Sequence, residues 1–425
     1  MASPYPDGDR EKVASKLPPG LQQELKIRSA ELGIDMQDAA TTAVTNWQTT
    51  PGQHVDTSGA RSFSTWLPVG MYDAFKDTCD TRDVSYIQGL AQSIRAWLDA
   101  NPSPGQTARP QDTRRLIVCN QKGGVGKTTI AAGVAEAEAE ADGVGAKYLN
   151  QFVADLTQTE LDRLNRTRDQ LEATISEYTA GGQRVLLVDY DPQLHLSKQL
   201  GITPIPVGQP SLVRHMTGEA DGDLRDLIVP IEDSRFGGRL HVLPGTREAF
   251  LLDSKLALTA AQSRGFQKET ALERALRPLE DDYDVMVIDS PPSLGLSMDA
   301  ALYYGRRRPN EKPGRSGVLI PVQSEDSSAD AYDMLAEQIE DLEEDLHLNI
   351  DRLGIVVNLF DSRRGYIATS SLEEWHSLEG PPVVAVLDDL KEQRETVRLK
   401  RPLLAYDPAS KQANIMRLIV AGAGQ

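Results

Sequence analysis

Apolar and polar residues alternate along two short segments near the start of the chain, Lys12–Leu17 and Ser62–Leu67. This period of two predicts β-strands with one face turned toward a core and the other turned away from it. A proline follows each segment, and two stretches with helical patterning come next. The predicted helices span about 19–32 and 35–47 in the first unit, and about 69–81 and 85–99 in the second.

The two strand–helix–helix units match each other at an offset of 50 residues. Leu17 and Pro18 align with Leu67 and Pro68, and Trp47 aligns with Trp97. Asp35 and Ser85 stand at equivalent places ahead of the second helix of each unit, where a short polar side chain caps a helix N-terminus. The repeats therefore span about 12–47 and 62–97 within a module of residues 1–99, and the Pro-containing segment 100–113 is a linker by composition.

Alternation assigns the two faces of the predicted strands. The residues that face the helices are Val13, Leu17, Phe63 and Leu67. The residues that share the opposite face are Lys12, Ala14 and Lys16 with their repeat partners Ser62, Ser64 and Trp66.

This repeated pattern resembles the ribbon-helix-helix family of DNA-binding proteins over about 90 residues. In that family, strands from two chains normally pair into a ribbon that enters the major groove. The resemblance implies a small, mainly α-helical domain with short strands, and DNA contacts from Lys12, Lys16, Ser62 and Ser64. A helical docking or dimerisation module is the alternative, because the domain is not basic overall. The sequence leaves open whether the repeats pair within one chain or between chains.

A glycine-rich segment, C-N-Q-K-G-G-V-G-K-T-T, follows the apolar run at 116–118 and precedes a helix-forming stretch. This strand–loop–helix context is the one that a phosphate-binding loop requires. Backbone N–H groups of Gly123, Gly124, Val125 and Gly126 would cradle phosphates at the helix N-terminus. Lys127 would reach the β- and γ-phosphates, and the hydroxyl of Thr128, beside Thr129, would hold Mg²⁺.

Two further apolar runs, 185–188 and 285–288, lead directly into acidic residues. The first is followed by Asp189 and Asp191, and the second by Asp289. An acid at the carboxyl end of a parallel strand is where a Mg²⁺-organising carboxylate belongs. A strand-end turn or a helix cap is the alternative for each aspartate taken alone.

The segment K-G-G-V-G-K-T-T resembles the deviant Walker A signature of ParA-type partition ATPases, MinD-like proteins and the nitrogenase iron protein. The segments around Asp191, Asp289, 320–323, 356–360 and 402–410 extend the resemblance to ParA over about 116–420. It implies that Lys122 contacts the nucleotide of a partner subunit in an ATP-dependent homodimer. It also implies catalytic roles for Lys127 and Asp191, metal binding by Thr128, Asp191 and Asp289, and a place near the adenine for Asn358.

The same resemblance implies an α/β domain at 114–425, with a mostly parallel P-loop sheet and helices on both faces. A sequence-independent DNA surface is implied for basic residues late in the chain, namely Arg363, Arg364, Arg394, Arg398, Lys400 and Arg401. Two segments depart from the family pattern, a long spacer at about 140–182 and a basic loop at 304–317. Each is interpreted either as a contact region for a partner or DNA, or as a tolerated surface insertion.

Composition narrows the range of functions. The formal net charge of -18 argues against a protein that coats polyanions, and residues 1–115 account for only -2 of it, from 12 basic and 14 acidic residues. The two cysteines exclude a disulfide framework, and they do not stand where the iron protein places its cluster ligands. The absence of a secretory signal, of a long apolar run and of a basic amphipathic C-terminal helix predicts a cytoplasmic, nucleoid-associated protein with no membrane partner.

The prediction is therefore a partition ATPase for a plasmid or chromosome. It would dimerise on Mg·ATP, bind DNA, hydrolyse ATP slowly under stimulation by a centromere-binding partner protein, and repress its own operon through the N-terminal module. The alternative is a transcription regulator or conjugation-associated factor in which ATP only switches dimerisation.

Overall fold

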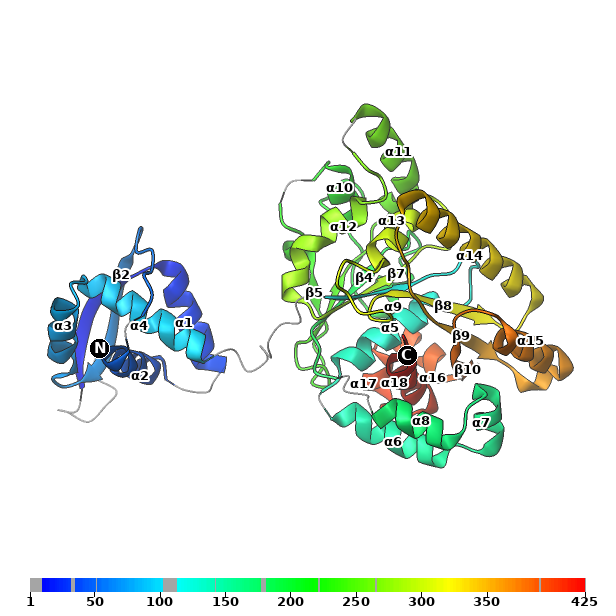
Figure 1. Ribbon diagram of the computed structural model, residues 1–425, viewed down its shortest axis with the longest axis horizontal. Coiled ribbons are helices and arrows are strands. Elements are labelled where there is room, and N and C mark those ends of the chain that lie inside the picture. The colour runs from blue at the N-terminus through cyan, green and yellow to red at the C-terminus, as the bar shows by residue number, and fades with distance from the viewer. Residues whose placement is uncertain are drawn as a thin grey trace. The chain divides into compact units, whose positions relative to one another are not determined.

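The computed structural model contains two compact units, Met1–Arg109 and Pro110–Gln425 (Figure 1). The structure describes residues 10–31, 35–50, 52–101, 113–141, 143–176, 181–220, 222–263, 266–389 and 391–424. Most of the predicted linker, residues 102–112, lies outside these residues.

The first unit contains two strands and four helices, in the order that the repeat predicts. They are β1 (Arg10–Leu17), α1 (Pro19–Glu31), α2 (Met36–Thr49), β2 (Arg61–Pro68), α3 (Met71–Thr81) and α4 (Tyr86–Ala100). The side chain of Asp35 accepts a hydrogen bond from the backbone N–H of Gln37, and that of Ser85 from the N–H of Gln88, so both predicted caps are present. The third helix begins at Met71 rather than at 69, because Gly70 adopts a left-handed conformation ahead of it.

The two strands pair antiparallel within the same chain, with Ala14 opposite Ser64 at the middle of the ribbon. Leu17 and Phe63 point into a core with Trp47, Phe75 and other helix residues, as the alternation predicts. The indole N–H of Trp47 donates to the side chain of Gln92 at 3.1 Å, so the polar atom of this buried ring is satisfied. One chain thus closes the hydrophobic core of the module by itself.

The second unit is built on an eight-stranded sheet in the order β10-β9-β8-β3-β7-β4-β6-β5. All neighbouring strands are parallel except β5, which runs antiparallel to β6 at one edge. The strands are β3 (Arg114–Val118), β4 (Val185–Asp189), β5 (Val229–Pro230), β6 (Leu240–Leu243), β7 (Val285–Asp289), β8 (Gly317–Gln323), β9 (Arg352–Phe360) and β10 (Val383–Asp388).

Helices cover both faces of this sheet, which confirms the predicted fold class (Figure 1). One face carries α5 (Lys127–Ala139), α6 (Val144–Asp155), α7 (Gln158–Leu164), α8 (Arg168–Ser176), α9 (His195–Gln199), α16 (Lys391–Leu399), α17 (Leu403–Tyr406) and α18 (Lys411–Gly422). The other carries α10 (Leu212–Thr217), α11 (Leu252–Gln262), α12 (Ala271–Leu276), α13 (Leu296–Gly305) and α14 (Asp326–Leu346). The remaining helical segments are α15 (Tyr366–Ser377) and the 3-10 turns η1 (Leu224–Leu227), η2 (Arg247–Leu251), η3 (Arg277–Asp282) and η4 (Ser362–Arg364).

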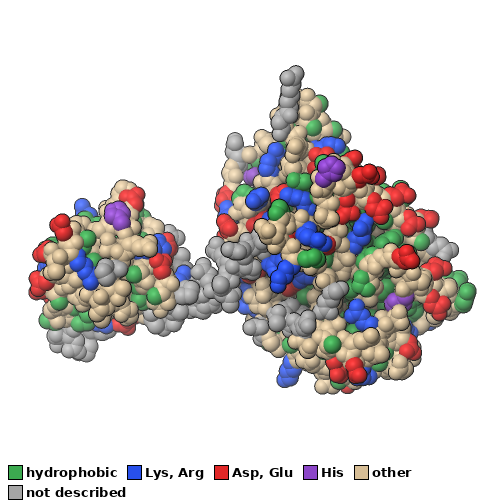
Figure 2. All heavy atoms as spheres, in the orientation of Figure 1, with side chains coloured by type: hydrophobic (Ala, Val, Ile, Leu, Met, Phe, Trp, Pro, Cys, Tyr) green, Lys and Arg blue, Asp and Glu red, His purple; other side chains and the backbone are tan. Residues whose placement is uncertain are grey.

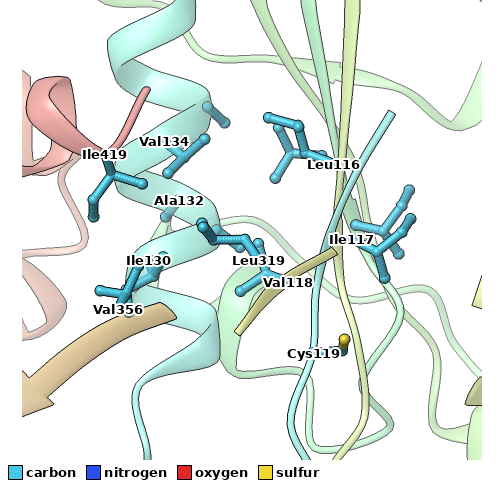
Figure 3. Close-up of a cluster of buried hydrophobic side chains, with 14 of the residues drawn as sticks. Leu116, Ile117, Val118, Cys119, Ile130, Ala132, Val134, Leu319, Val356 and Ile419 are labelled. Atoms are coloured by element: carbon cyan, nitrogen blue, oxygen red, sulfur yellow. The ribbon is translucent and has the colours of Figure 1, made fainter. Parts of the chain in front are cut away.

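Burial on both faces explains why the strands are continuous apolar runs rather than alternating ones. Along β3, Leu116 and Val118 point toward α5, where Ile130 and Val134 lie, whereas Ile117 points to the opposite face (Figure 3). All of these side chains are at most 2% exposed. The sheet thereby fixes the end of β3, from which the glycine-rich loop departs.

The two segments that depart from the family pattern, the spacer at about 140–182 and the basic loop at 304–317, both pack within this unit. The described part of the spacer at about 140–182 forms three helices, α6, α7 and α8. In the loop at 304–317, Arg306 and Arg308 pair with Glu273, and Arg307 pairs with Asp351. These arginines serve internal contacts, because each has a carboxylate partner inside the unit.

Acidic side chains gather over α14, which accounts for part of the negative charge of this unit (Figure 2). Among the described residues, no helix is long and apolar enough to cross a membrane.

Candidate nucleotide-binding site

The glycine-rich loop connects β3 to α5, which begins at Lys127. Gly124 and Gly126 have φ values of +80° and +89°, in the left-handed region that favours glycine. A Cβ built on Gly126 would lie 2.0 Å from Nδ2 of Asn358, while one on Gly123 or Gly124 would meet open space. The loop is therefore closed on one side by Asn358 and open on the other, where phosphates would lie.

Lys127 is 6% exposed, and its Nζ donates to the backbone carbonyl of Lys122 at 2.9 Å. This bond folds the ammonium back over the loop, as a phosphate-binding lysine requires. Burial lowers the pKa of Lys127, and the nearby charges of Asp289 and Asp191 oppose that shift. The ammonium and the two carboxylates therefore belong to one electrostatic cluster.

The predicted acids meet at one edge of the sheet because β4 and β7 are neighbours in register, with Asp189 opposite Asp289. Asp289 is fully buried, and neither of its carboxylate oxygens has a partner within hydrogen-bonding geometry in the described structure. Burial raises the pKa of Asp289 well above its usual range, and the Thr128 side chain opposes the rise. A buried acceptor without a protein partner fits a carboxylate that binds a metal ion or its water shell.

The other two aspartates differ in their partners. Asp189 accepts hydrogen bonds from the backbone N–H and the hydroxyl of Ser197, at 2.9 and 2.5 Å, and burial raises its pKa to about 6. Asp189 therefore stabilises the start of α9, which agrees with the alternative that it serves as a turn or helix cap rather than as a metal ligand. Asp191 accepts from the N–H of Gln193 at 2.8 Å and lines the cleft beside Lys127.

The cleft in front of the loop has a volume of about 790 Å³, which is in the range of small-molecule sites. Its lining includes the loop and helix residues Gly123, Gly124, Gly126, Lys127, Thr128 and Thr129. It also includes His195, Lys198, Val397 and Lys400, of which only Lys400 had been singled out in the sequence, as a DNA contact. The nearest signal for His195 and Lys198 is the segment around Asp191, which they follow by four and seven residues.

Lys122 has partners that the sequence did not reveal. Its Nζ lies 3.1 Å from Oε2 of Glu325 and 3.2 Å from Oγ of Ser328, at the start of α14. Glu325 also pairs with Arg364 at 2.7 Å, and hydrogen bonds from Arg364 and Lys122 lower its pKa. Within this chain, the lysine is therefore held by residues of its own subunit.

Asn358 is 3% exposed and donates to the backbone carbonyl of Val125 at 2.8 Å. It supports the loop from behind and does not line the cleft described above. Its predicted place near the adenine stays a prediction.

The predicted DNA-binding arginines of this unit are exposed, and several have acidic neighbours. Arg363 pairs with Asp361, Arg394 with Asp389, and Arg401 lies 3.9 Å from Asp233. Exposed pairs of this kind contribute little to stability, so these arginines remain candidates for DNA contacts.

Comparison with known proteins also supports a nucleotide-binding site at this cleft. A family model described as an AAA domain matches residues 173–352, which include all three aspartates but not the glycine-rich loop. Over 305 residues the chain is 29% identical to the chromosome partitioning protein ParA of Myxococcus xanthus, covering 70% of this chain and 83% of the relative. It is 26% identical over 303 residues to the sporulation initiation inhibitor protein Soj of Bacillus subtilis, covering 71% and 94%.

Among solved structures, a Cyanothece McdA variant in complex with ATP superposes with a TM-score of 0.50 at 16% identity, covering 74% of this chain and 99% of that one. This likeness confirms the fold. The loop, the paired acids and the similarity to the relatives above support a ParA-type P-loop ATPase.

Proposed function

We propose that this protein is a DNA segregation ATPase that dimerises on Mg·ATP and binds DNA in that state. The observation that carries the proposal is a glycine-rich loop that lines one cleft with Lys127 and Asp191 and that also contains a second lysine, Lys122. The name of the Myxococcus relative, a chromosome partitioning protein, supports DNA partition as the process.

In this proposal, the site binds the nucleotide phosphates through positive charge and positions the metal ion and the attacking water. Backbone N–H groups of the loop and the start of α5 hold the phosphates, and Lys127 neutralises their charge. Thr128, Asp289 and Asp191 would hold Mg²⁺, which when bound screens the β- and γ-phosphates. Asp191, which faces the cleft, would orient the attacking water for a slow hydrolysis step.

Lys122 would act in a partner subunit. In the chain alone, Glu325 and Ser328 satisfy its ammonium, so a trans contact requires exchange of these bonds for phosphate oxygens of the partner's nucleotide. A phosphate is the stronger partner because it carries more charge in a site with less water. Hydrolysis would remove that partner and return Lys122 to Glu325, which separates the subunits.

DNA would be bound at two places. The exposed arginines late in the chain would hold duplex without regard to sequence, and dimerisation would double their number. The β1–β2 ribbon would enter the major groove of an operator with Lys12, Lys16, Ser62 and Ser64, which are all exposed. By this proposal the protein represses its own operon, lies on the nucleoid, and is stimulated by a centromere-binding partner.

The alternative function, a regulator or conjugation-associated factor switched by ATP, differs in its DNA requirement. We would titrate full-length protein with random duplex, with and without Mg·ATP, by fluorescence anisotropy. A partition ATPase binds random duplex only with Mg·ATP, whereas a regulator needs its operator. Deleting residues 1–99 should abolish operator binding and leave binding to random DNA; unchanged operator affinity would remove the repressor role.

A further inference from the structure

The backbone pairing of the β1–β2 ribbon has the twofold symmetry that two identical chains would give. Its side chains do not follow that symmetry. Its register pairs Lys12 with Trp66, Ala14 with Ser64, and Lys16 with Ser62. The repeat offset of 50 maps Ala14 onto Ser64, so the middle pair consists of repeat equivalents. The same offset exchanges the two outer pairs, which is the signature of a pseudo-twofold axis through the middle of the ribbon.

The outward side chains break this symmetry. A ribbon made by two identical chains would present the same residues at both ends, because a twofold axis repeats every position. Here the axis maps Lys12 onto Ser62 and Trp66 onto Lys16. One end of the ribbon therefore carries a lysine opposite a tryptophan, and the other carries a lysine opposite a serine.

These two ends suit different base edges. A lysine donates to the acceptors of guanine, so both ends can favour a G·C pair. Trp66 is partly exposed and offers a large apolar surface, which suits the methyl group of thymine. Ser62 is exposed and small, and its hydroxyl donates or accepts without strong preference. Each end therefore carries one lysine, from β1, but the β2 residue opposite that lysine differs between the two ends.

The ribbon also has a defined reach. Lys12 and Lys16 are four residues apart on one strand, which places them about 14 Å apart at roughly 3.4 Å per residue. At ~3.4 Å per base pair, this distance covers about four base pairs of the groove. A single chain is thus long enough to read a complete short element without a second copy.

We infer that the N-terminal module reads a non-palindromic DNA element of about four base pairs, in one orientation, with Trp66 and Ser62 distinguishing its two ends. This inference rests on the proposed binding of the ribbon to an operator. It gives the protein a direction on DNA that a homodimeric ribbon lacks.

The test selects bound sequences from duplexes in which about eight consecutive base pairs are randomised, too few for two ribbons one helical turn apart. Full-length protein is used without Mg·ATP, so that ATP-dependent binding to random DNA does not contribute. The wild-type protein should enrich a motif that is not an inverted repeat, and reversing that motif within fixed flanks should weaken binding about tenfold.

The matched variants are S62K/W66K, which makes the two ends equal, and T42K/T49K, which adds the same two charges on the exposed side of α2. The first should enrich an inverted repeat and lose the orientation preference, while the second should keep the wild-type motif. Circular dichroism melting shows whether each variant is folded.

A palindromic wild-type motif would overturn the inference and leave operator binding intact. An asymmetric motif that S62K/W66K does not change would also overturn it, since the reading residues would then lie elsewhere. Failure to enrich any motif would instead refute operator binding by the module, and the inference with it.

Discussion

Substitution of Gly126 by alanine tests how the nucleotide loop is held. At φ +89°, a residue with a Cβ costs about 1–2 kcal/mol in backbone strain. The added Cβ would also lie 2.0 Å from Nδ2 of Asn358, which must then give up its buried hydrogen bond to Val125. Leaving those groups unpaired costs about 1–3 kcal/mol, so the total is roughly 2–5 kcal/mol.

For a domain of roughly 300 residues, a loss of about 3 kcal/mol lowers Tm by roughly 5 °C. Differential scanning calorimetry of the full chain measures this shift, and ATP affinity should fall with it. Gly123→Ala is the control, because that position has open space and no left-handed φ, and its cost should stay within ~0.5 kcal/mol. In an Asn358→Ala background, Gly126→Ala should cost less than in the wild type, because the clash is gone. A Gly126→Ala protein with unchanged Tm would refute the described loop.

Two further predictions concern buried charges. Glu311 and Arg115 form a fully buried pair, so Glu311→Ala should destabilise the chain by about 3–5 kcal/mol in urea unfolding, while Asp223→Ala, which removes an exposed partner of Arg225, should destabilise it much less. Equal effects would contradict the assigned burial. Burial raises the pKa of Glu136 to about 8, above its unfolded value of 4.5, so the folded state holds the proton between these values and stability falls as pH rises from 4.5 to 8. Glu136→Gln should therefore gain stability relative to wild type between pH 5 and pH 8, measured by paired thermal melts; a difference independent of pH would count against it.

The sequence predicted those features that depend on local pattern. Strands β1 and β2 and their outward faces follow from alternation, and the loop with Lys127 follows from its glycines and its strand–helix context. The meeting of Asp289 with the loop follows from the rule that parallel strands end at one edge of a sheet.

Contacts between segments that are distant in the chain could not be predicted from the sequence. Nothing near Lys122 in the chain indicates Glu325, because strand order places α14 beside the loop across some 200 residues. The basic loop at 304–317 looked like a candidate contact surface, since charge pattern alone does not show that Arg306 and Arg308 face Glu273. Pairing of the two repeats within one chain likewise required the fold, because sequence similarity between repeats is equally compatible with exchange between chains.

The central claim, that ATP joins two subunits through Lys122 to make a DNA-binding state, is tested most directly by one comparison. Wild type, Lys122→Ala and Lys268→Ala, which removes a lysine that pairs with Glu269 and does not line the described cleft, are titrated with random duplex with and without Mg·ATP. The account predicts that wild type and Lys268→Ala bind only with Mg·ATP and that Lys122→Ala does not bind. Binding that is independent of both Mg·ATP and Lys122 would contradict it.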